Sequence, residues 1–510
     1  MLIKQSKNAF IRTTQRYGYI VNQLTRHDRT YDEYGADLLR SISREPQDVD
    51  DIVNKLLEIY EGVSFDELKA DFMDFANSLA RDKFVVMGDT EDILEQKDDD
   101  FTYAIDNPKT LVDNYYQETE EKVGQNTQDF FYEELQGRPL ISTLQFELSS
   151  RCNERCIHCY IPNDKKNHGF DMPLEKVKSV IDEFSAMGGI NVTLSGGEAF
   201  LHKDLMTIVK YCREKDLKIS ILSNLISLKD EHIKVLKEAN ISLIQVSLYS
   251  MDPAVHDFIT TIPGSWKRTK GAIEKLVAED IPVQISCPLM KANKVGYDKV
   301  LEYARSLKIK AQTDYIIMAR SDLDTGNLAN RLSIEETADV LRDIINNDID
   351  YREQTLTQVP PSEEMVLDFE KFKQQPVCSV GYDNCCITAN GDVYPCAGWQ
   401  DYILGNVYKQ SLKDIWENSE KVKALRQITQ ASFPQCLECE AQDYCARCLV
   451  RNYNESGGDM FAVNHHFCEV AFLTKKIVEE EFGPEIDRRE RLLVERLKAG
   501  QTEIAVHMLN

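Results

Sequence analysis

Residues 144–160 read LQFELSSRCNERCIHCY, and this stretch decides how the rest of the chain is interpreted. Its first residues alternate between apolar and polar, which predicts a β-strand with one buried face. Three cysteines follow at once in the spacing C-x3-C-x2-C; they are Cys152, Cys156 and Cys159. Three thiolates this close together can hold one iron–sulfur cubane and leave one iron without a protein ligand. A structural zinc site needs four closed ligands and no fourth cysteine is near, so the spacing favours iron and sulfur.

Strand-like and helix-like segments alternate on both sides of this motif, from 139 to about 350. The expected strands are 144–148, 190–194, 217–222, 243–248, 283–286 and 309–317, and helical patterns cover 174–187, 229–239 and 266–278. Six strand–helix units in succession predict an α/β fold, a parallel sheet curled into a partial (βα)6 barrel. Chemistry is then expected at the carboxyl ends of the strands, where the cysteine loop also lies.

The next strands end in residues that suit a small ligand. The second runs into Gly196-Gly197-Glu198, where glycines allow a close backbone approach and the glutamate offers a carboxylate. The third ends in Ser223-Asn224 and the fourth contains Ser247, all with polar tips. These residues should share one face with the cysteine loop.

Nine further cysteines lie in the tail, between Cys378 and Cys468. The segment Gly391–Cys396 has the form G-x4-C, and a later stretch has the form C-x2-C-x5-C-x2-C. The members of that later stretch are Cys436, Cys439, Cys445 and Cys448. A zinc module explains the double C-x2-C but leaves five cysteines over. Cys212 and Cys287 stand alone in apolar segments and are interpreted as buried, inert thiols.

The ends of the chain differ from its middle. Residues 1–88 predict β segments at 9–12 and 19–23, helices at 33–41, 49–59 and 64–80, and a strand at 84–87, a small winged-helix-like unit. Residues 89–138 are acidic and predict a linker, with some helix around 127–135. Residues 351–375 form a bridging region, 376–470 hold the tail cysteines, and 471–510 belong to a C-terminal helix.

Composition excludes several classes of function. The chain has 510 residues, 60 Lys and Arg against 85 Asp and Glu, and a formal charge of -25. A surface this acidic repels nucleic acid and anionic lipid, and no apolar run reaches the length of a membrane span. The first residues have no export signal, so a cytoplasmic protein is expected, in which clustered cysteines indicate metal rather than disulfides.

Taken together, the cysteine triad, the Gly-Gly-Glu and the Ser-Asn in a six-unit barrel resemble a radical S-adenosylmethionine (SAM) enzyme. The resemblance implies that Cys152, Cys156 and Cys159 hold a 4Fe–4S cluster whose open iron binds SAM. It also implies a cofactor site in which Gly196, Gly197 and Glu198 meet the methionine amino group, Ser223 and Asn224 the ribose, and Tyr160 the adenine side. Many relatives have an arginine for the SAM carboxylate where this chain has Thr260, so hydroxyls such as Ser247 are expected to serve instead.

The tail resembles the SPASM extension of such enzymes, which carries two auxiliary 4Fe–4S clusters. The resemblance implies one cluster held by Cys436, Cys439, Cys445 and Cys468. The other would be held by Cys378, Cys396 and Cys448, with Cys385 or Cys386 as a fourth ligand, or with an open iron. Neighbours on a strand face opposite ways, so at most one of the adjacent pair can bind; Cys385 is the one retained in the predicted set.

The whole layout resembles maturases of ribosomally made peptides, with a PqqD-like N-terminal element that binds the leader of a precursor peptide. This implies thioether or carbon–carbon crosslinking, with electrons from an external donor such as flavodoxin or ferredoxin. One alternative is a formylglycine-forming sulfatase maturase, but Cys396 is followed by Ala397 and not by the expected Asp. Another is a peptide-binding iron–sulfur scaffold without radical chemistry. The general base stays open; Tyr249, Asp314 and Asp324 lie near the right strand ends.

Overall fold

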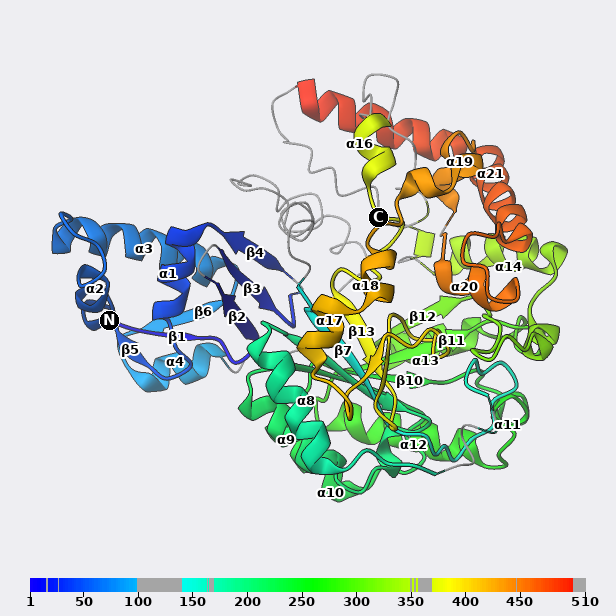
Figure 1. The fold of residues 1–510 in the computed structure, drawn as a ribbon, viewed down its shortest axis with the longest axis horizontal. Coiled ribbons are helices and arrows are strands. Elements are labelled where there is room, and N and C mark those ends of the chain that lie inside the picture. The colour runs from blue at the N-terminus through cyan, green and yellow to red at the C-terminus, as the bar shows by residue number, and fades with distance from the viewer. Residues whose placement is uncertain are drawn as a thin grey trace.

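Six parallel strands form the centre of the molecule, in the order in which they occur along the chain (Figure 1). They are β7 (Thr143–Ser149), β8 (Asn191–Gly196), β9 (Lys218–Ser223), β10 (Leu243–Ser247), β11 (Val283–Pro288) and β12 (Lys310–Asp314). The computed structural model describes residues 1–498 except 15–16, 26, 99–139, 163, 165–168, 349–350, 353–354, 356–368 and 446, and it leaves out the side chains of 371 and 486–498. The predicted partial barrel is confirmed.

Helices cover the outer face of this sheet. They are α8 (Leu174–Ala186), α9 (Leu205–Glu214), α10 (Asp230–Glu238), α12 (Ser265–Ala278), α13 (Asp298–Ser306) and α14 (Ile334–Asn347). Helix α11 (Pro253–Thr260) lies instead beside the cysteine loop, where Ile157 N donates to Ile259 O at 3.0 Å. Helix α8 shows why they pack there, because Val177, Ile181 and Phe184 recur at helical spacing and are fully buried against the strands. Short 3-10 turns, η1 (Ala199–Leu201) and η2 (Gly326–Asn330), complete this part.

The cysteine-rich tail continues the barrel sheet, which the sequence did not predict. Strand β13 (Asn384–Ile387) pairs in parallel with β7, and β14 (Asp392–Tyr394) and β15 (Gly405–Asn406) follow antiparallel, giving nine strands in all. Its other elements are α16 (Phe369–Gln374), α17 (Leu412–Asn418), α18 (Glu420–Leu425), η3 (Gln430–Ser432), α19 (Pro434–Leu437), η4 (Gln442–Tyr444), α20 (Leu449–Glu455) and α21 (His465–Lys498). Helix α21 starts earlier than predicted, so Cys468 lies in its first turns.

Residues 1–98 form a separate small unit of two three-stranded sheets and four helices. One sheet holds β1 (Leu2–Gln5), β5 (Gln47–Asp48) and β6 (Val85–Gly88); the other holds β2 (Ala9–Thr13), β3 (Gly18–Asn22) and β4 (Asp28–Tyr31). The helices are α1 (Glu33–Ser41), α2 (Val49–Leu57), α3 (Phe65–Arg81) and α4 (Glu91–Asp98). The predicted segments are confirmed, including the capping box of Ser64 and Glu67.

Helix α4 corrects the expected start of the acidic linker. Asp98 accepts hydrogen bonds from Ser6 Oγ at 2.7 Å and Lys7 N at 3.1 Å, so residues 91–98 belong to the N-terminal unit. The helix predicted around 127–135 lies outside the described residues. Among the described helices, none is both long and apolar enough to cross a bilayer.

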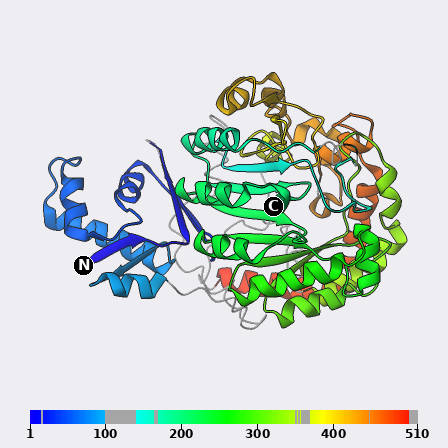
Figure 2. The same cartoon turned by 90° about the horizontal axis from the view of Figure 1, so that it is seen from below.

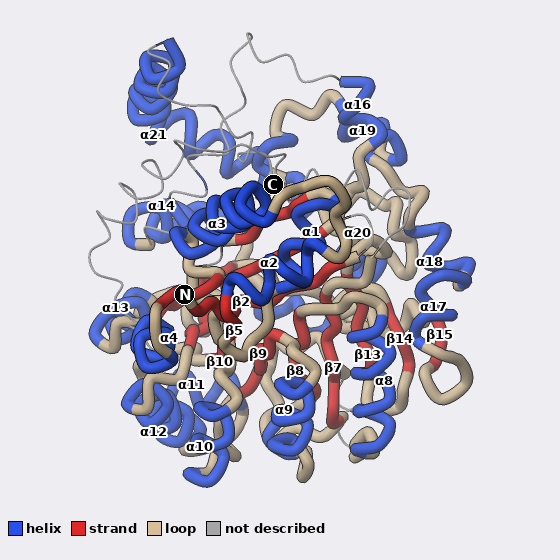
Figure 3. Tube along the Cα trace, turned by 90° about the vertical axis from the view of Figure 1, so that its left-hand side faces the viewer, coloured by secondary structure: helices blue, strands red, loops and turns tan. Residues whose placement is uncertain are grey.

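The N-terminal unit docks on the amino ends of the barrel strands (Figure 2). Arg12 Nε donates to Gly189 O at 2.9 Å, just before β8, and Arg44 Nε donates to Asp216 Oδ1 at 2.7 Å, just before β9. Asn240, before β10, donates to Asn8 Oδ1 at 3.0 Å. Figure 3, viewed from this side, shows the barrel strands side by side behind the unit. The cysteine loop after β7 therefore lies at the opposite end of the barrel.

Candidate functional site

The cysteine loop follows β7 at the carboxyl end of the barrel. Its three cysteines are half-buried, and Cys159 N donates to Cys156 O at 3.2 Å. Burial first, and then the charges of Glu154 and of the other two cysteines, raises the pKa of Cys156. Within the described part of the chain, no three metal-binding side chains converge as they would around a single ion. Cys152 and Cys159 act electrostatically on Cys156, so the three thiols lie close together, as a cluster held by three thiolates requires.

Two glycines bring the end of β8 against this loop. At Gly196, where φ is +143°, a Cβ would lie 2.4 Å from Ser149 O, and at Gly197 it would lie 2.4 Å from Arg151 O. The N–H groups of Gly197 and Glu198 donate to these same carbonyls, each at 2.8 Å. The glycines are therefore needed because any side chain would separate the two motifs.

The Glu198 carboxylate connects β8 to the end of β9. It accepts hydrogen bonds from Phe200 N at 2.9 Å, Asn224 N at 2.8 Å and Ser223 Oγ at 2.7 Å. Burial raises the pKa of Glu198, and these donors oppose the rise. Asn224 Nδ2 in turn donates to Asn153 Oδ1 in the cysteine loop, at 2.6 Å. The Gly-Gly-Glu, the Ser-Asn and the cysteine loop thus form one connected site, as their place at the strand ends predicts.

Tyr160 and Ser247 lie at different edges of this site. Burial raises the pKa of Tyr160, and its ring lies beside the tail, since a Cβ on Gly398 would be 3.6 Å from Tyr160 Cδ2. The contact of Tyr160 with the adenine side of SAM stays a prediction. Ser247 ends β10, and close to it the Tyr249 hydroxyl reaches Cys156 Sγ at 3.8 Å.

Thr260 does not take over the role of the missing arginine. It is fully buried, and its Oγ1 lies 2.7 Å from Ser265 Oγ. Arg268 on α12 is a cation near the cysteine loop, where its charge acts on Glu154. The contact of Ser247 with the SAM carboxylate stays a prediction.

Glu154 is a residue of this site that sequence reasoning missed. Its side chain is only 3% exposed, and its Oε2 accepts from Cys156 Sγ at 3.3 Å. Burial raises the pKa of Glu154 to about 7. The sequence does show a glutamate between two of the predicted cluster ligands. Such a residue is unexpected there, because it adds negative charge beside thiolates.

The first tail group of thiols is buried beside the barrel. Cys378, Cys396 and Cys448 act on one another electrostatically, and burial raises the pKa of Cys378 to about 11 and of Cys396 to about 12. Cys386 lies near this group, because the charge of Cys396, after burial, raises the pKa of Cys386. Cys385 instead packs among the apolar core residues, where burial is the cause of its raised pKa. Of the adjacent pair on β13, Cys386 is therefore the better candidate for the fourth ligand, and the predicted role of Cys385 stays a prediction.

The second tail group lies nearer the surface. The charges of Cys436 and Cys439 act on Cys468, and those of Cys468 and Cys436 act on Cys445, whose pKa burial raises to about 11. A cavity of about 30 Å³ opens among Cys436, Cys445 and Cys468. These are the four cysteines predicted to share one cluster, and the structure brings them together.

A buried carboxylate connects the cysteine loop with the first tail group. Glu147 on β7 accepts a hydrogen bond from the Tyr394 hydroxyl, and its Oε2 accepts from Gln400 Nε2 at 2.6 Å. Tyr394 also acts on Cys386, and Glu147 on Tyr160. Side chains of the barrel and of the tail thus contact each other between the cysteine loop and the first tail group.

The three candidate bases lie in different surroundings. Tyr249 is beside Cys156. Asp314, at the end of β12, accepts from Ile316 N at 2.7 Å, and burial raises its pKa. Asp324 is on the outside, where it pairs with Arg320. Asp324 is therefore the least suited of the three to meet a substrate at the barrel mouth.

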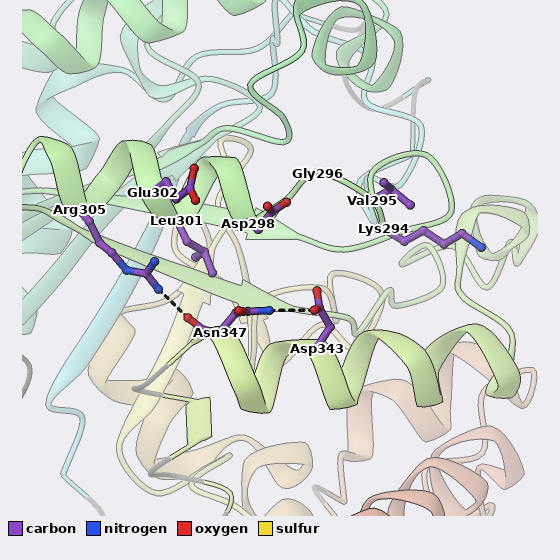
Figure 4. A pocket seen from close by; sticks show the side chains of 9 residues that line it. All are labelled: Lys294, Val295, Gly296, Asp298, Leu301, Glu302, Arg305, Asp343 and Asn347. Carbon is purple, nitrogen blue, oxygen red and sulfur yellow. Dashed lines mark hydrogen bonds between the residues drawn. The ribbon is translucent and has the colours of Figure 1, made fainter.

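A surface cavity of about 350 Å³ lies apart from this site, between α13 and α14 (Figure 4). Its polar groups pair with one another, since Arg305 donates to Asn347 O and Asn347 to Asp343 Oδ1 at 2.8 Å. No cysteine is among its lining residues. The cysteine loop, the Gly-Gly-Glu and the Ser-Asn of the barrel mouth do not line this cavity.

Comparisons with known proteins agree with this geometry. Residues 146–304 match the radical SAM superfamily, and residues 378–448 match SPASM, an iron–sulfur cluster-binding domain. An AdoMet-dependent heme synthase of Methanosarcina barkeri is 25% identical over 62% of this chain and 93% of its own. The subtilosin biosynthesis protein AlbA of Bacillus subtilis is 26% identical over 62% of this chain and 69% of its own.

Solved structures show the same fold. SuiB of Streptococcus suis, bound to its precursor peptide SuiA, has a TM-score of 0.59 at 16% identity and covers 88% of this chain and 96% of its own. Native anSMEcpe, with AdoMet and the Cp18Cys peptide, has a TM-score of 0.53 at 15% identity and covers 69% of this chain and all of its own. The radical SAM domain binds SAM and a 4Fe–4S cluster, and the SPASM domain binds auxiliary iron–sulfur clusters. The chain therefore contains a radical SAM domain followed by a SPASM iron–sulfur cluster-binding domain.

Proposed function

We propose that this enzyme modifies a ribosomally made precursor peptide by forming an intramolecular thioether or carbon–carbon crosslink. The observation that carries the proposal is the N-terminal unit, a sheet-and-helix domain docked on the barrel in addition to the SAM and cluster sites. The relatives add support, because AlbA is named for bacteriocin biosynthesis and SuiB was solved with a precursor peptide. A tail like that of SuiB and a recognition unit together suit a peptide substrate.

The N-terminal unit offers a strand edge to the leader of such a peptide. Among the described residues, β4 pairs with β3 on one side only. Asn22 N donates to His27 O at 2.9 Å, and hydrogen-bonded pairs alternate with non-bonded pairs along an antiparallel ladder. The backbone N–H and C=O groups of Arg29 therefore point toward β3, whereas those of Asp28 and Thr30 point outward. Helix α3 flanks this strand, with Phe75 5.1 Å from the Tyr31 ring. An added peptide strand beside β4 would gain main-chain hydrogen bonds and an aromatic neighbour.

Each cysteine group has a role in this reaction. Cys152, Cys156 and Cys159 would hold the SAM-binding cluster; the two tail groups would hold two auxiliary clusters, with Cys386 as the fourth ligand of the first. When bound, the first cluster and SAM would supply a 5′-deoxyadenosyl radical, which takes a hydrogen atom from the peptide. The auxiliary clusters would supply an acceptor for the electron that is left over when the new bond forms. The chain's own task would be to hold the peptide at the barrel mouth. Asp314 is the candidate to receive its proton there, because burial raises the pKa of its carboxylate, whereas the raised pKa of Tyr249 keeps that phenol protonated. Flavodoxin or ferredoxin would deliver the first electron.

Heme synthesis is the competing function, because the AdoMet-dependent heme synthases also match. Those relatives align with 62–64% of this chain and AlbA with 62%, so the aligned share does not separate the two functions. The two functions separate in one experiment, in which the reconstituted protein receives SAM, a reductant and either a candidate precursor peptide or an iron–porphyrin. Crosslinking predicts that the peptide loses two hydrogen atoms per bond, while the porphyrin is unchanged. Conversion of the porphyrin alone would reject the proposal.

A matched pair of variants tests the recognition role. Thr30→Pro removes an outward N–H of β4 and leaves the β3 ladder intact, whereas Thr30→Val keeps the N–H. The leader should bind at least about tenfold more weakly to the Pro variant, because an edge hydrogen bond is lost and the proline ring opposes the added strand. Fluorescence anisotropy with a labelled leader peptide measures this. Equal affinity for both variants would place the leader elsewhere.

A further inference from the structure

The surface beside the cysteine loop carries an exposed aromatic side chain. Helix α11 lies there, on the side of the barrel away from the N-terminal unit (Figure 1). Its Phe258 is 63% exposed, more than any other aromatic residue that the structure describes. Single exposed apolar residues are common on proteins, so exposure alone indicates no partner. The contacts of α11 with the loop and the charges around Phe258 therefore decide whether this surface has a function.

A short backbone path joins Phe258 to the cysteine loop. The next residue, Ile259, accepts a hydrogen bond at its carbonyl oxygen from Ile157 N, at 3.0 Å. Ile157 directly follows Cys156, and both pack against the small apolar cluster that contains Ile259. A few covalent bonds and this hydrogen bond thus connect the exposed residue with a predicted cluster ligand. An electron that arrives at this surface has a compact route to the cluster.

Two cations flank the same point. Lys291 N donates to Asn330 O at 3.0 Å, and Asn330 Nδ2 donates to Ile157 O at 3.0 Å, so Lys291 lies next to the loop. Arg268 Nε donates to Gly264 O at 3.3 Å, in the turn between α11 and α12. Both cations are exposed, and each side chain donates to a backbone carbonyl. Within the described part of the chain, neither forms an ion pair, so both charges are available to a partner.

This local positive charge contrasts with the whole chain, whose formal charge is -25. The acidic residues of α11 are engaged at its ends, where Asp252 accepts from Ala254 N at 2.8 Å and Asp257 from Trp266 N at 2.9 Å. An acidic partner is repelled by most of this protein and attracted by this surface, which steers its approach. Small interfaces of this kind are typical of brief electron-transfer encounters.

We propose that the surface formed by Phe258, Arg268 and Lys291 is the docking site of the external electron donor, and that this donor is a small redox protein with an acidic surface. The inference rests on the proposed function only in that the cluster on the cysteine loop must be reduced before SAM is cleaved. One electron leaves the reduced donor and enters the cluster. The donor is thereby oxidised by one electron, the cluster is reduced by one, and no atom is transferred.

Reduction of the cluster tests the assignment without any substrate. Full-length protein is reconstituted with iron and sulfide and mixed anaerobically with reduced flavodoxin or reduced ferredoxin, two acidic donors. Freeze-quenched samples give the rate at which the electron paramagnetic resonance signal of the SAM-binding cluster appears, and Cys152→Ala identifies that signal by its absence. The surface variants are Phe258→Ala and Lys291→Glu. Lys55→Glu, on the exposed side of α2 in the N-terminal unit, is the control with the same change of charge.

Lys291→Glu should slow reduction by the better donor about tenfold at low ionic strength, and the difference should shrink in about 0.5 M salt, where charges are screened. Phe258→Ala should slow it about fivefold at either salt concentration, because an apolar contact is lost. Lys55→Glu should match the wild type, and the small reductant dithionite should reduce all proteins at comparable rates.

Equal rates with the protein donor for the wild type and both surface variants would overturn the proposal. So would a Lys55→Glu variant as slow as Lys291→Glu, or a wild type that dithionite reduces and neither acidic donor does. A protein that shows the expected reduction rates but crosslinks no peptide would contradict the proposed function alone.

Discussion

At the residue scale, the spacing of the cysteines predicted their grouping almost completely. The triad and the group of Cys436, Cys439, Cys445 and Cys468 lie together as expected. The choice within the adjacent pair on β13 could not be made, because strand alternation says that the two thiols face opposite ways but not which way either faces. Glu154 was missed for a related reason, since burial of a loop residue depends on the elements that close over it.

The triad and a lone cysteine make a matched comparison of metal binding. Wild-type protein should hold about twelve irons per chain, and Cys152→Ala about eight, with no cleavage of SAM. Cys212→Ala should hold as much iron as the wild type, because Cys212 is fully buried in the apolar core and only packing is lost. Iron analysis and 5′-deoxyadenosine measurement check this. Loss of iron in the Cys212 variant would show that metal content reports stability rather than ligation.

The adjacent pair on β13 gives a second comparison. Cys386→Ala should alter the electron paramagnetic resonance signal of the first auxiliary cluster and lower the iron content, because its thiol faces Cys396. Cys385→Ala should keep both and lose about 1 kcal/mol of stability, as a small core cavity forms. A loss of iron and an altered cluster signal in Cys385→Ala, with both unchanged in Cys386→Ala, would show that Cys385 is the fourth ligand.

At the element scale, hydrophobic periodicity predicted the barrel, since α8 and its neighbours bury regular apolar faces. It missed β4, whose sequence DRTY is polar because the strand lies at a sheet edge and is held by pairing with β3. It also missed that β13 joins β7, because a pairing between segments 241 residues apart, as Cys385 with Leu144, leaves no local pattern.

Two glycines test the contact between β8 and the cysteine loop. Gly197→Ala would put a Cβ 2.4 Å from Arg151 O and 2.9 Å from Cys152 Cβ, so it should destabilise the protein by more than about 1 kcal/mol and lower the iron content. Gly271→Ala, inside α12 with nothing within 4 Å of its Cβ, should stabilise it by about 0.5–1 kcal/mol. Thermal unfolding measures both. A neutral Gly197 variant would mean that the loop does not need this close approach.

At the scale of the whole molecule, the N-terminal unit and the cysteine loop lie at opposite ends of the barrel. The N-terminal unit contacts Gly189 and Asp216 before the strands, and the cysteine loop follows them (Figure 2). A strand such as β8, six residues long, spans roughly 20 Å. On the proposed function, a peptide bound to the N-terminal unit would have to cover at least that distance to reach the cysteine loop.

Spacer length in the precursor should therefore limit the reaction. Shortening the segment between leader and modified residues below about six residues should abolish crosslinking without weakening leader binding, because an extended chain covers about 3.3 Å per residue. Mass spectrometry and anisotropy on the same peptides separate the two effects. Full crosslinking with a shorter spacer would mean that the leader binds near the barrel mouth.

The most direct test of the whole account is a single anaerobic assay of the reconstituted protein with SAM, a reductant and the precursor peptide. 5′-Deoxyadenosine and peptide mass are measured together, with Cys152→Ala as the control that lacks the SAM cluster. The account predicts one 5′-deoxyadenosine for each crosslink and a peptide lighter by two hydrogen atoms per bond. Formation of 5′-deoxyadenosine beside a peptide of unchanged mass would contradict it.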